Sequence, residues 1–121
     1  MAKKDELGRR GEDVAAEYVE AQGMRVLERN WRCREGEIDV VALDGGDVVV
    51  VEVKTRTGTG FGHALEAVTP AKLARLRRLA AAWCREHPSA TERGLRIDVV
   101  GITVERCAGH ERIDHVRGVV A

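Results

Sequence analysis

The strongest constraint on the fold of this chain is a run of four consecutive valines, Val48 to Val51. Uninterrupted β-branched residues without polar alternation are typical of a strand that is buried on both faces of a sheet. A second strand signal occupies residues 37–43, and the sequence Asp44-Gly45-Gly46 lies between the two. Such a sequence favours a tight hairpin turn. We therefore predict that residues 37–43 and 47–54 pair as antiparallel strands in the centre of a sheet.

Hydrophobic periodicity, capping residues and turn residues predict the other elements. Thr69 and Pro70 are typical of a helix cap followed by a first helical residue. In chain order we expect a helix at 5–22, a strand at 24–30, a polar connection at 32–36, the central hairpin, a Gly-rich loop at 55–68, a helix from Pro70, a strand at 95–104 and a further strand at 112–119.

This order of elements, α-β-β-β-α-β with a possible final β, indicates an α/β fold. The economical arrangement is one mixed sheet flanked by two helices. The 121 residues fit a single domain spanning 1–121, with a core at about 5–104 and a C-terminal strand or tail at 105–121.

Charge and composition narrow the class of protein. Twenty basic residues balance twenty acidic ones, so net charge gives no sign of a polyanionic partner. Residues 71–85, however, contain five basic side chains and no acidic one, which predicts a basic helix face. No apolar stretch is long enough for a membrane span, and the N-terminal residues lack a secretory signal. The three cysteines follow no paired spacing, so we expect reduced thiols in a cytoplasmic protein with no membrane association.

The central hairpin also carries a candidate active site. Residues two apart in a strand share a face, so Glu52 and Lys54 point the same way. The hairpin turn is expected to place Asp39 opposite Glu52, with Cβ atoms within about 5.5 Å of each other. Two carboxylates at that distance repel unless a cation lies between them. Mg²⁺ prefers oxygen ligands, and the backbone carbonyl of Val53 could complete a set formed by Asp39 and Glu52.

Lys54 adds a positive charge to this face, where it could neutralise a phosphate or orient an attacking water. The alternative is an ordinary surface hairpin with a Glu–Lys pair and an unrelated aspartate. Glu52 interrupts a run of β-branched residues, where a charge is unfavourable unless it is paired or bound to metal. That setting favours the functional interpretation.

Several short motifs together resemble the YraN family of bacterial proteins. They are Gly8-Arg9-Arg10-Gly11-Glu12, Arg29-Asn30-Trp31-Arg32, Gly36-Glu37-Ile38-Asp39, Val51-Glu52-Val53-Lys54-Thr55-Arg56, Phe61-Gly62, Lys72 and Arg96-Ile97-Asp98-Val99-Val100. That family is similar to the PD-(D/E)XK nucleases and, among them, to the archaeal Holliday-junction resolvases.

The resemblance implies a restriction-endonuclease-like fold and a phosphodiesterase site that depends on Mg²⁺, with Mn²⁺ as a substitute. Asp39, Glu52 and Lys54 take the places of the acidic residues and the lysine of the nuclease motif. Ile38 precedes Asp39, so the proline of the motif name is absent.

Other residues could support this site, and each has a simpler explanation. By resemblance to the resolvases, Glu12 would join the site from the first helix, and this is favoured over the alternative of a solvated helix glutamate. The flanking Gly8 and Gly11 suggest that this helix approaches the sheet closely. Glu37 could assist Asp39 or form a salt bridge at the strand edge. The basic residues expected to bind a phosphate backbone, or else to face solvent, are Arg56, Lys72 and Arg75.

Three classes of function remain open. The first is a metal-dependent endonuclease acting on nucleic acid; by the resemblance, its substrate would be branched or structured DNA, and it could work as a homodimer. The second is a nucleic-acid-binding module or partner subunit that keeps the fold and the site without cutting. A structural protein with a coincidental pattern would bind neither metal nor DNA.

Overall fold

The computed structural model describes residues 4–57, 68–90, 94–105 and 110–119. In chain order its elements are α1 (Lys4–Ala21), β1 (Arg25–Cys33), β2 (Gly36–Asp44), β3 (Asp47–Thr57), α2 (Pro70–Glu86), a short 3₁₀ helix η2 (Pro88–Ala90), β4 (Gly94–Glu105) and β5 (His110–Val116). The predicted order of helices and strands is confirmed, and the final strand is present.

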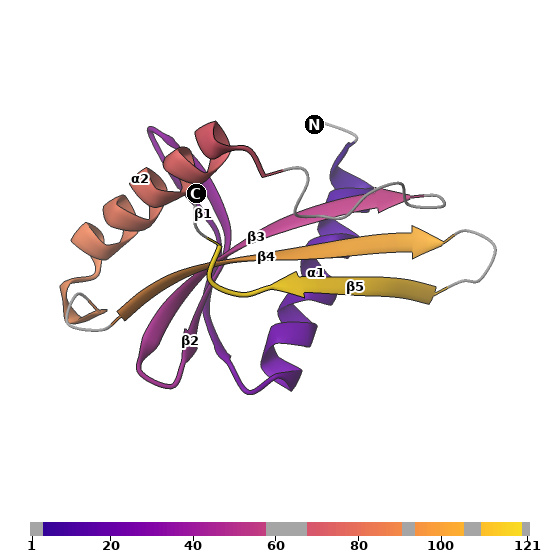
Figure 1. Cartoon of the computed structure of the whole chain (residues 1–121), viewed down its shortest axis with the longest axis horizontal. Helices are drawn as coiled ribbons and strands as arrows, with labels where there is room; N and C mark the ends of the chain where they lie inside the picture. The colour runs from indigo at the N-terminus through magenta and orange to yellow at the C-terminus, as the bar shows by residue number, and fades with distance from the viewer. Residues whose placement is uncertain (1–3, 58–67, 91–93, 106–109, 120–121) are drawn as a thin grey trace.

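The strands form one mixed sheet in the order β1-β2-β3-β4-β5, with the two helices packed against it (Figure 1). Pairing is antiparallel except between β3 and β4, which run parallel and are connected through α2. A parallel pair needs such a crossover connection, because a tight turn can only reverse the chain. The architecture is the predicted α/β fold of the restriction-endonuclease-like type.

The valine run forms the middle of the core. Val48 to Val51 are all 0% exposed, as expected for a central strand. Val48 and Val50 pack in the cluster that contains α2, whereas Val49 and Val51 pack in the cluster that contains α1. Burying each such side chain stabilises the fold by roughly 1.5–3 kcal/mol. The run therefore joins both helices to the sheet and fixes β3 as the central scaffold.

Local contacts set where the helices begin and how they pack. The Thr69 hydroxyl accepts a hydrogen bond from the backbone N–H of Lys72 at 3.2 Å, which confirms the predicted cap of α2. On α1, a Cβ atom at Gly11 would collide with the side chain of Thr55 on β3. The predicted close approach is thus confirmed at Gly11. Gly8 has no atom within 4 Å of that position, so the same prediction is wrong there.

Several strands are longer than predicted. β1 continues to Cys33 and pairs with Gly36 at the start of β2, so the expected polar connection at 32–36 shrinks to residues 34–35. β3 continues to Thr57 because β4 pairs with it along its whole length. The predicted Gly-rich loop therefore begins later, and residues 58–67, including Phe61 and Gly62, lie outside the described residues. β5 ends at Val116 rather than at 119.

A fully buried aspartate, Asp98 on β4, connects β4 by hydrogen bonds to β5 and to the residues that follow it. Its carboxylate accepts hydrogen bonds from Nε of Arg96 (2.9 Å), from Nε2 of His115 (2.8 Å) and from the backbone N–H of Gly118 (3.0 Å). Nδ1 of His115 in turn lies 3.0 Å from the Tyr18 hydroxyl on α1. Burial alone would raise the pKa of Asp98, but these donors outweigh it, with Arg96 foremost, and the pKa lies below its usual value.

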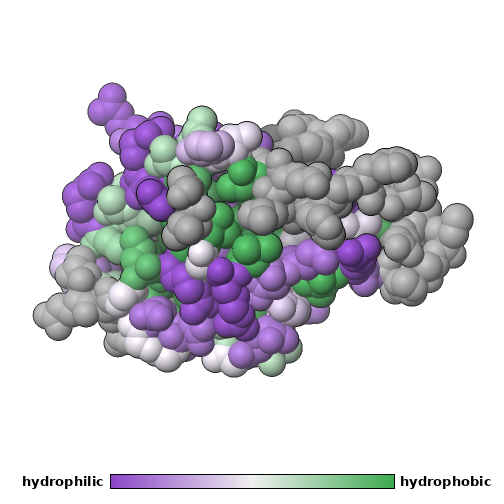
Figure 2. All heavy atoms as spheres, in the orientation of Figure 1, coloured by the Kyte–Doolittle hydropathy of each residue, from purple (hydrophilic) through white to green (hydrophobic). Residues whose placement is uncertain are grey.

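Polar side chains cover much of the face turned to the viewer in Figure 2, with apolar ones gathered near its middle. None of the helices in the described part of the chain is long and apolar enough to cross a membrane.

Candidate active site

The hairpin of β2 and β3 sets the position of the candidate site. The predicted register holds from Asp44 opposite Asp47 up to Val40 opposite Val51. Backbone pairing ends there, one residue before Asp39 and Glu52. Oδ2 of Asp39 instead accepts a hydrogen bond of 2.8 Å from the backbone N–H of Val53. The expected pairing of Asp39 with Glu52 as opposite residues is therefore corrected, because at this point a side chain rather than the ladder joins the two strands.

Asp39 is the most perturbed acid of the site. Its pKa is raised from 3.8 to about 7, first because burial disfavours the charged form and next because of the negative charge of Glu52. The hydrogen bond from Val53 opposes this rise, and the carboxylates of Glu12 and Glu37 add to it. Three acidic side chains thus act on Asp39 at this end of the hairpin. Such an arrangement is unfavourable without a cation and typical of a functional site.

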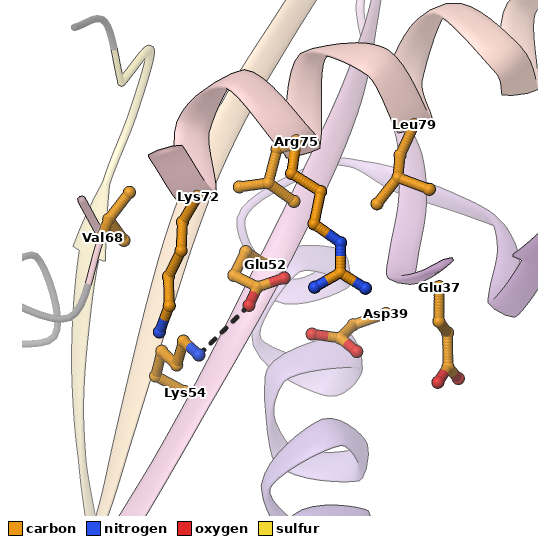
Figure 3. Close-up of a pocket in the computed structure, with 9 residues that line it drawn as sticks. Glu37, Asp39, Glu52, Lys54, Val68, Lys72, Arg75 and Leu79 are labelled. Carbon is orange, nitrogen blue, oxygen red and sulfur yellow. Dashed lines mark ion pairs between the residues drawn. The ribbon is translucent and has the colours of Figure 1, made fainter. Parts of the chain in front are cut away.

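Glu52 and Lys54 share a face, as predicted. Nζ of Lys54 lies 3.4 Å from Oε2 of Glu52, and their side chains are 30% and 20% exposed respectively. Figure 3 shows this ion pair beside Asp39. The lysine neutralises Glu52 in part, whereas the hydrogen bond that Asp39 accepts within the described part of the chain comes from the neutral N–H of Val53.

On the α2 side, these residues line a cavity of about 330 Å³. Lys72 and Arg75 extend into it from α2, and Figure 3 shows the Arg75 guanidinium pointing towards Asp39. Nε of Arg75 donates to the backbone carbonyl of Glu35 at 3.4 Å, and a Cβ atom at Gly36 would collide with the guanidinium. The absence of a side chain at Gly36 therefore leaves room for the guanidinium of Arg75. Two of the three predicted phosphate-binding residues, Lys72 and Arg75, face the cavity.

On the α1 side, a second cavity of about 390 Å³ reaches the same carboxylates. Its lining includes Glu12, Asp39, Glu52, the residues Leu7 and Gly8 of α1, and Val53, Lys54 and Thr55 of β3. The close packing of Gly11 against Thr55 brings the adjacent Glu12 to this position. The structure therefore brings Glu12 together with Asp39 and Glu52. Arg56, the third predicted phosphate-binding residue, lines neither cavity.

Asn30 belongs to the site, although the sequence did not indicate it. Its side-chain amide donates to Oε1 of Glu12 at 2.9 Å and to Oε2 of Glu37 at 3.1 Å. Asn30 is also the one non-glycine residue in the described chain with a positive φ, 54°. Asparagine tolerates that backbone conformation better than most residues. The only signal in the sequence was its place within Arg29-Asn30-Trp31-Arg32, whose resemblance carried no role for the amide.

The donor set fits a hard divalent cation. Carboxylate oxygens and a backbone carbonyl are the ligands that Mg²⁺ and Mn²⁺ prefer, and the raised pKa of Asp39 shows that negative charge here is not fully compensated. Among the described residues, no three acidic, histidine or cysteine side chains converge closely enough to form a complete metal site. Ligation by Asp39, Glu52 and the Val53 carbonyl therefore stays a prediction.

Comparison with known proteins places the chain among bacterial relatives of the same length. A protein of Arthrobacter sp. named UPF0102 protein is 57% identical over 119 residues, covering 98% of this chain and 99% of its own. Another of the same name, from Beutenbergia cavernae, is 56% identical with the same coverage. One from Frankia alni is 53% identical over 98% of this chain and 97% of its own. Residues 11–102 match the family as a whole, so the chain belongs to the uncharacterised protein family UPF0102, which is the YraN family that its motifs resemble.

Proposed function

We propose that this protein is a metal-dependent endonuclease that hydrolyses phosphodiester bonds of nucleic acid. The observation that carries the proposal is the position of Asp39. It lies among Glu52, Glu12 and Glu37 with a pKa raised to about 7, beside a cavity into which two basic side chains extend. Acids that repel one another next to cations suit a site that binds a divalent metal and a phosphate together.

Each residue of the site has a role in this proposal. Asp39 and Glu52 would hold Mg²⁺ or Mn²⁺, with the Val53 carbonyl as a further ligand and Glu12 in support. When bound, the metal would supply Lewis-acid stabilisation of the phosphate and lower the pKa of a water molecule. Lys54 lies 3.4 Å from Glu52, where its ammonium group can stabilise charge that develops on the phosphate.

The substrate would lie across the α2-side cavity. Lys72 and Arg75 would contact phosphates there, and Arg56 would contact the backbone further along β3. The planar guanidinium of Arg75, fixed over Gly36, suits two-pronged contact with phosphate oxygens. Branched or structured DNA, a homodimer and a cytoplasmic location complete the proposal, and they rest on the resemblance to resolvases and on the sequence.

One observation favours a second candidate, a nucleic-acid-binding module that does not cut. Lys54 already pairs with Glu52, so part of the acidic charge is compensated without metal. A protein that bound DNA through Arg75 and Lys72 alone would need no further ion. Such binding would be independent of Mg²⁺ and insensitive to replacement of Glu52.

The deciding experiment is cleavage of a labelled panel of single-stranded, duplex, flapped and four-way-junction DNA and of RNA, with Mg²⁺, Mn²⁺ or EDTA. Glu52→Gln and Lys54→Met keep side-chain size while removing each charge, and Glu20→Gln on the exposed side of α1 is the matched control. We expect metal-dependent cutting that Glu52→Gln and Lys54→Met abolish and Glu20→Gln leaves intact. Tight binding without cutting, unchanged by Glu52→Gln and EDTA, would overturn the enzyme and establish the binding module.

A further inference from the structure

Asn30 holds a rare backbone conformation and makes two hydrogen bonds with a single amino group. Its φ of 54° lies in the left-handed region, which is unfavourable for most residues that carry a Cβ atom. From β1 its side chain reaches Glu12 on α1 and Glu37 on β2. Glu12 and Glu37 are thus joined by one amide, although they lie in different elements.

The chemistry of the three groups fixes the direction of these bonds. An ionised carboxylate only accepts hydrogen bonds, so the amide must present its NH₂ group to both glutamates. Asn30 engages one oxygen of each, Oε1 of Glu12 and Oε2 of Glu37. The other oxygen of Glu37, Oε1, lies 3.8 Å from Nε of Arg32. Both oxygens of Glu37 therefore face a donor, whereas the contacts among the described residues give Oε2 of Glu12 no such partner.

The two glutamates also line different cavities. Glu12 lines the α1-side cavity with both Asp39 and Glu52. Glu37 lines the α2-side cavity, which Asp39 and Glu52 also line, on the side of Arg75. Of the two acids that Asn30 holds, Glu12 is the one that lines the same cavity as Val53, whose carbonyl is a proposed ligand.

We infer that Asn30 is a positioning residue for the cation site: it orients the Glu12 carboxylate so that Oε2 can bind the metal, and Glu37 serves as an anchor for the amide rather than as a ligand. This inference rests on the proposed function. An unrestrained glutamate side chain must lose rotamer freedom when it binds a metal, and the amide has already removed that freedom. Groups that orient a ligand in this way typically contribute 10–100-fold to metal affinity.

The test is Mn²⁺ binding to the metal-free protein, measured by calorimetry and by the paramagnetic resonance signal of free Mn²⁺. Asn30→Gly removes the amide and leaves the left-handed backbone unstrained, because glycine accepts that conformation. Glu12→Gln removes the proposed ligand. Glu37→Gln keeps a carbonyl oxygen that can accept from Asn30, so it serves as the matched control. The double variant Asn30→Gly/Glu12→Gln shows whether the two residues act together.

We expect Asn30→Gly to weaken Mn²⁺ binding about tenfold, and Glu12→Gln at least as much. Glu37→Gln should change the dissociation constant by less than about threefold, and the double variant should bind no more weakly than Glu12→Gln alone. A purely structural role would lower the melting temperature in EDTA without this pattern of affinities. Unchanged affinity in Asn30→Gly, additive losses in the double variant, or a loss in Glu37→Gln as large as that in Glu12→Gln would overturn the inference while leaving the metal site intact. If the unaltered protein binds no Mn²⁺, the proposed metal site is itself wrong, and the positioning role of Asn30 is wrong with it.

Discussion

Asp39 and Asp98 are two aspartates withdrawn from solvent in the same sheet, and their pKa values move in opposite directions. Asp98 receives hydrogen bonds from an arginine, a histidine and a backbone N–H, and its pKa is lowered. Among the described residues, Asp39 accepts one hydrogen bond, from a backbone N–H, and has three acidic neighbours, and its pKa is raised to about 7. Asp98 is fully buried and Asp39 partly buried, and burial acts to raise the pKa of each. The difference lies in the partners, and it separates a carboxylate with three hydrogen-bond donors from the one that we propose binds a cation.

The largest effect that would test this contrast is expected from Asp98→Ala. The substitution leaves Arg96, His115 and the N–H of Gly118 without their shared acceptor in a fully buried place. We expect the free energy of unfolding in urea to fall by about 3–5 kcal/mol. A loss below about 1 kcal/mol would show that the network contributes little and that Asp98 is not the structural member of the pair.

Asp39→Asn should raise, rather than lower, the free energy of unfolding of the metal-free protein. The folded-state pKa of Asp39 lies above its unfolded value of 3.8, so the folded state binds more protons and wild-type stability falls as pH rises from about 4 to 7. Asparagine carries no charge and escapes this loss. We expect the variant to be more stable than wild type by about 2 kcal/mol at pH 8 in EDTA, and equally stable below pH 4.

Urea unfolding across that pH range measures the effect. Asp13→Asn, which alters an exposed carboxylate paired with Arg29, is the control and should show little change. If Asp39→Asn is less stable than wild type at pH 8, the ionised carboxylate is well compensated, and Asp39 does not differ from Asp98 in this respect.

Added Mg²⁺ should offset the loss of stability that the charge of Asp39 causes, and this effect should not involve Asp98. At ten times its dissociation constant, a ligand of the folded state stabilises by about 1.4 kcal/mol. We expect an upward shift of the melting temperature of the wild-type protein at pH 8, no shift in Asp39→Asn, and an undiminished shift in Asp98→Asn. An equal shift in the Asp39 variant would place the cation elsewhere.

The smallest effects concern which neighbour acts on Asp39. Among the charged neighbours, Glu52 raises its pKa most, followed by Glu12 and Glu37. A carbon-13 titration of the Asp39 carboxyl group should therefore show the largest downward shift in Glu52→Gln and smaller ones in Glu12→Gln and Glu37→Gln. None of the three should move the titration of Asp98. A different order would revise the positions of these side chains.

Much of the fold and of the candidate site could be predicted from the sequence, because the signals lie in short stretches of neighbouring residues. The valine run identified the central strand, the Asp-Gly-Gly turn fixed the register, and alternation placed Glu52 beside Lys54. One local feature could not be predicted. Backbone pairing stops at Val40, next to the hydrogen bond between the Asp39 carboxylate and Val53, and hydrophobic periodicity does not indicate where strand pairing ends.

What could not be predicted depended on partners distant in the sequence. A charge inside an apolar strand was the signal for Glu52, and Asp98 carries the same signal between Ile97 and Val99. Only the fold shows that Asp98 meets His115 and Gly118 whereas Asp39 meets other acids. The role that we propose for Asn30 likewise depends on a backbone angle and on contacts with two separate elements. A sequence can thus indicate that a carboxylate is buried without showing whether its charge is satisfied.

The parallel pairing of β3 with β4 has a consequence for the order in which the chain folds. β1, β2 and β3 follow one another through short turns, whereas Asp47 must find Gly94 across the whole of α2. Contacts between distant residues form slowly, because the intervening chain loses more entropy when they close. We therefore expect Asp39 and Glu52 to meet in an early meander, and Asp98 to gain its partners only when the crossover closes. Repulsion between acids would be present in the nascent sheet before the ion network that completes it, and a divalent cation present at that stage would speed its formation.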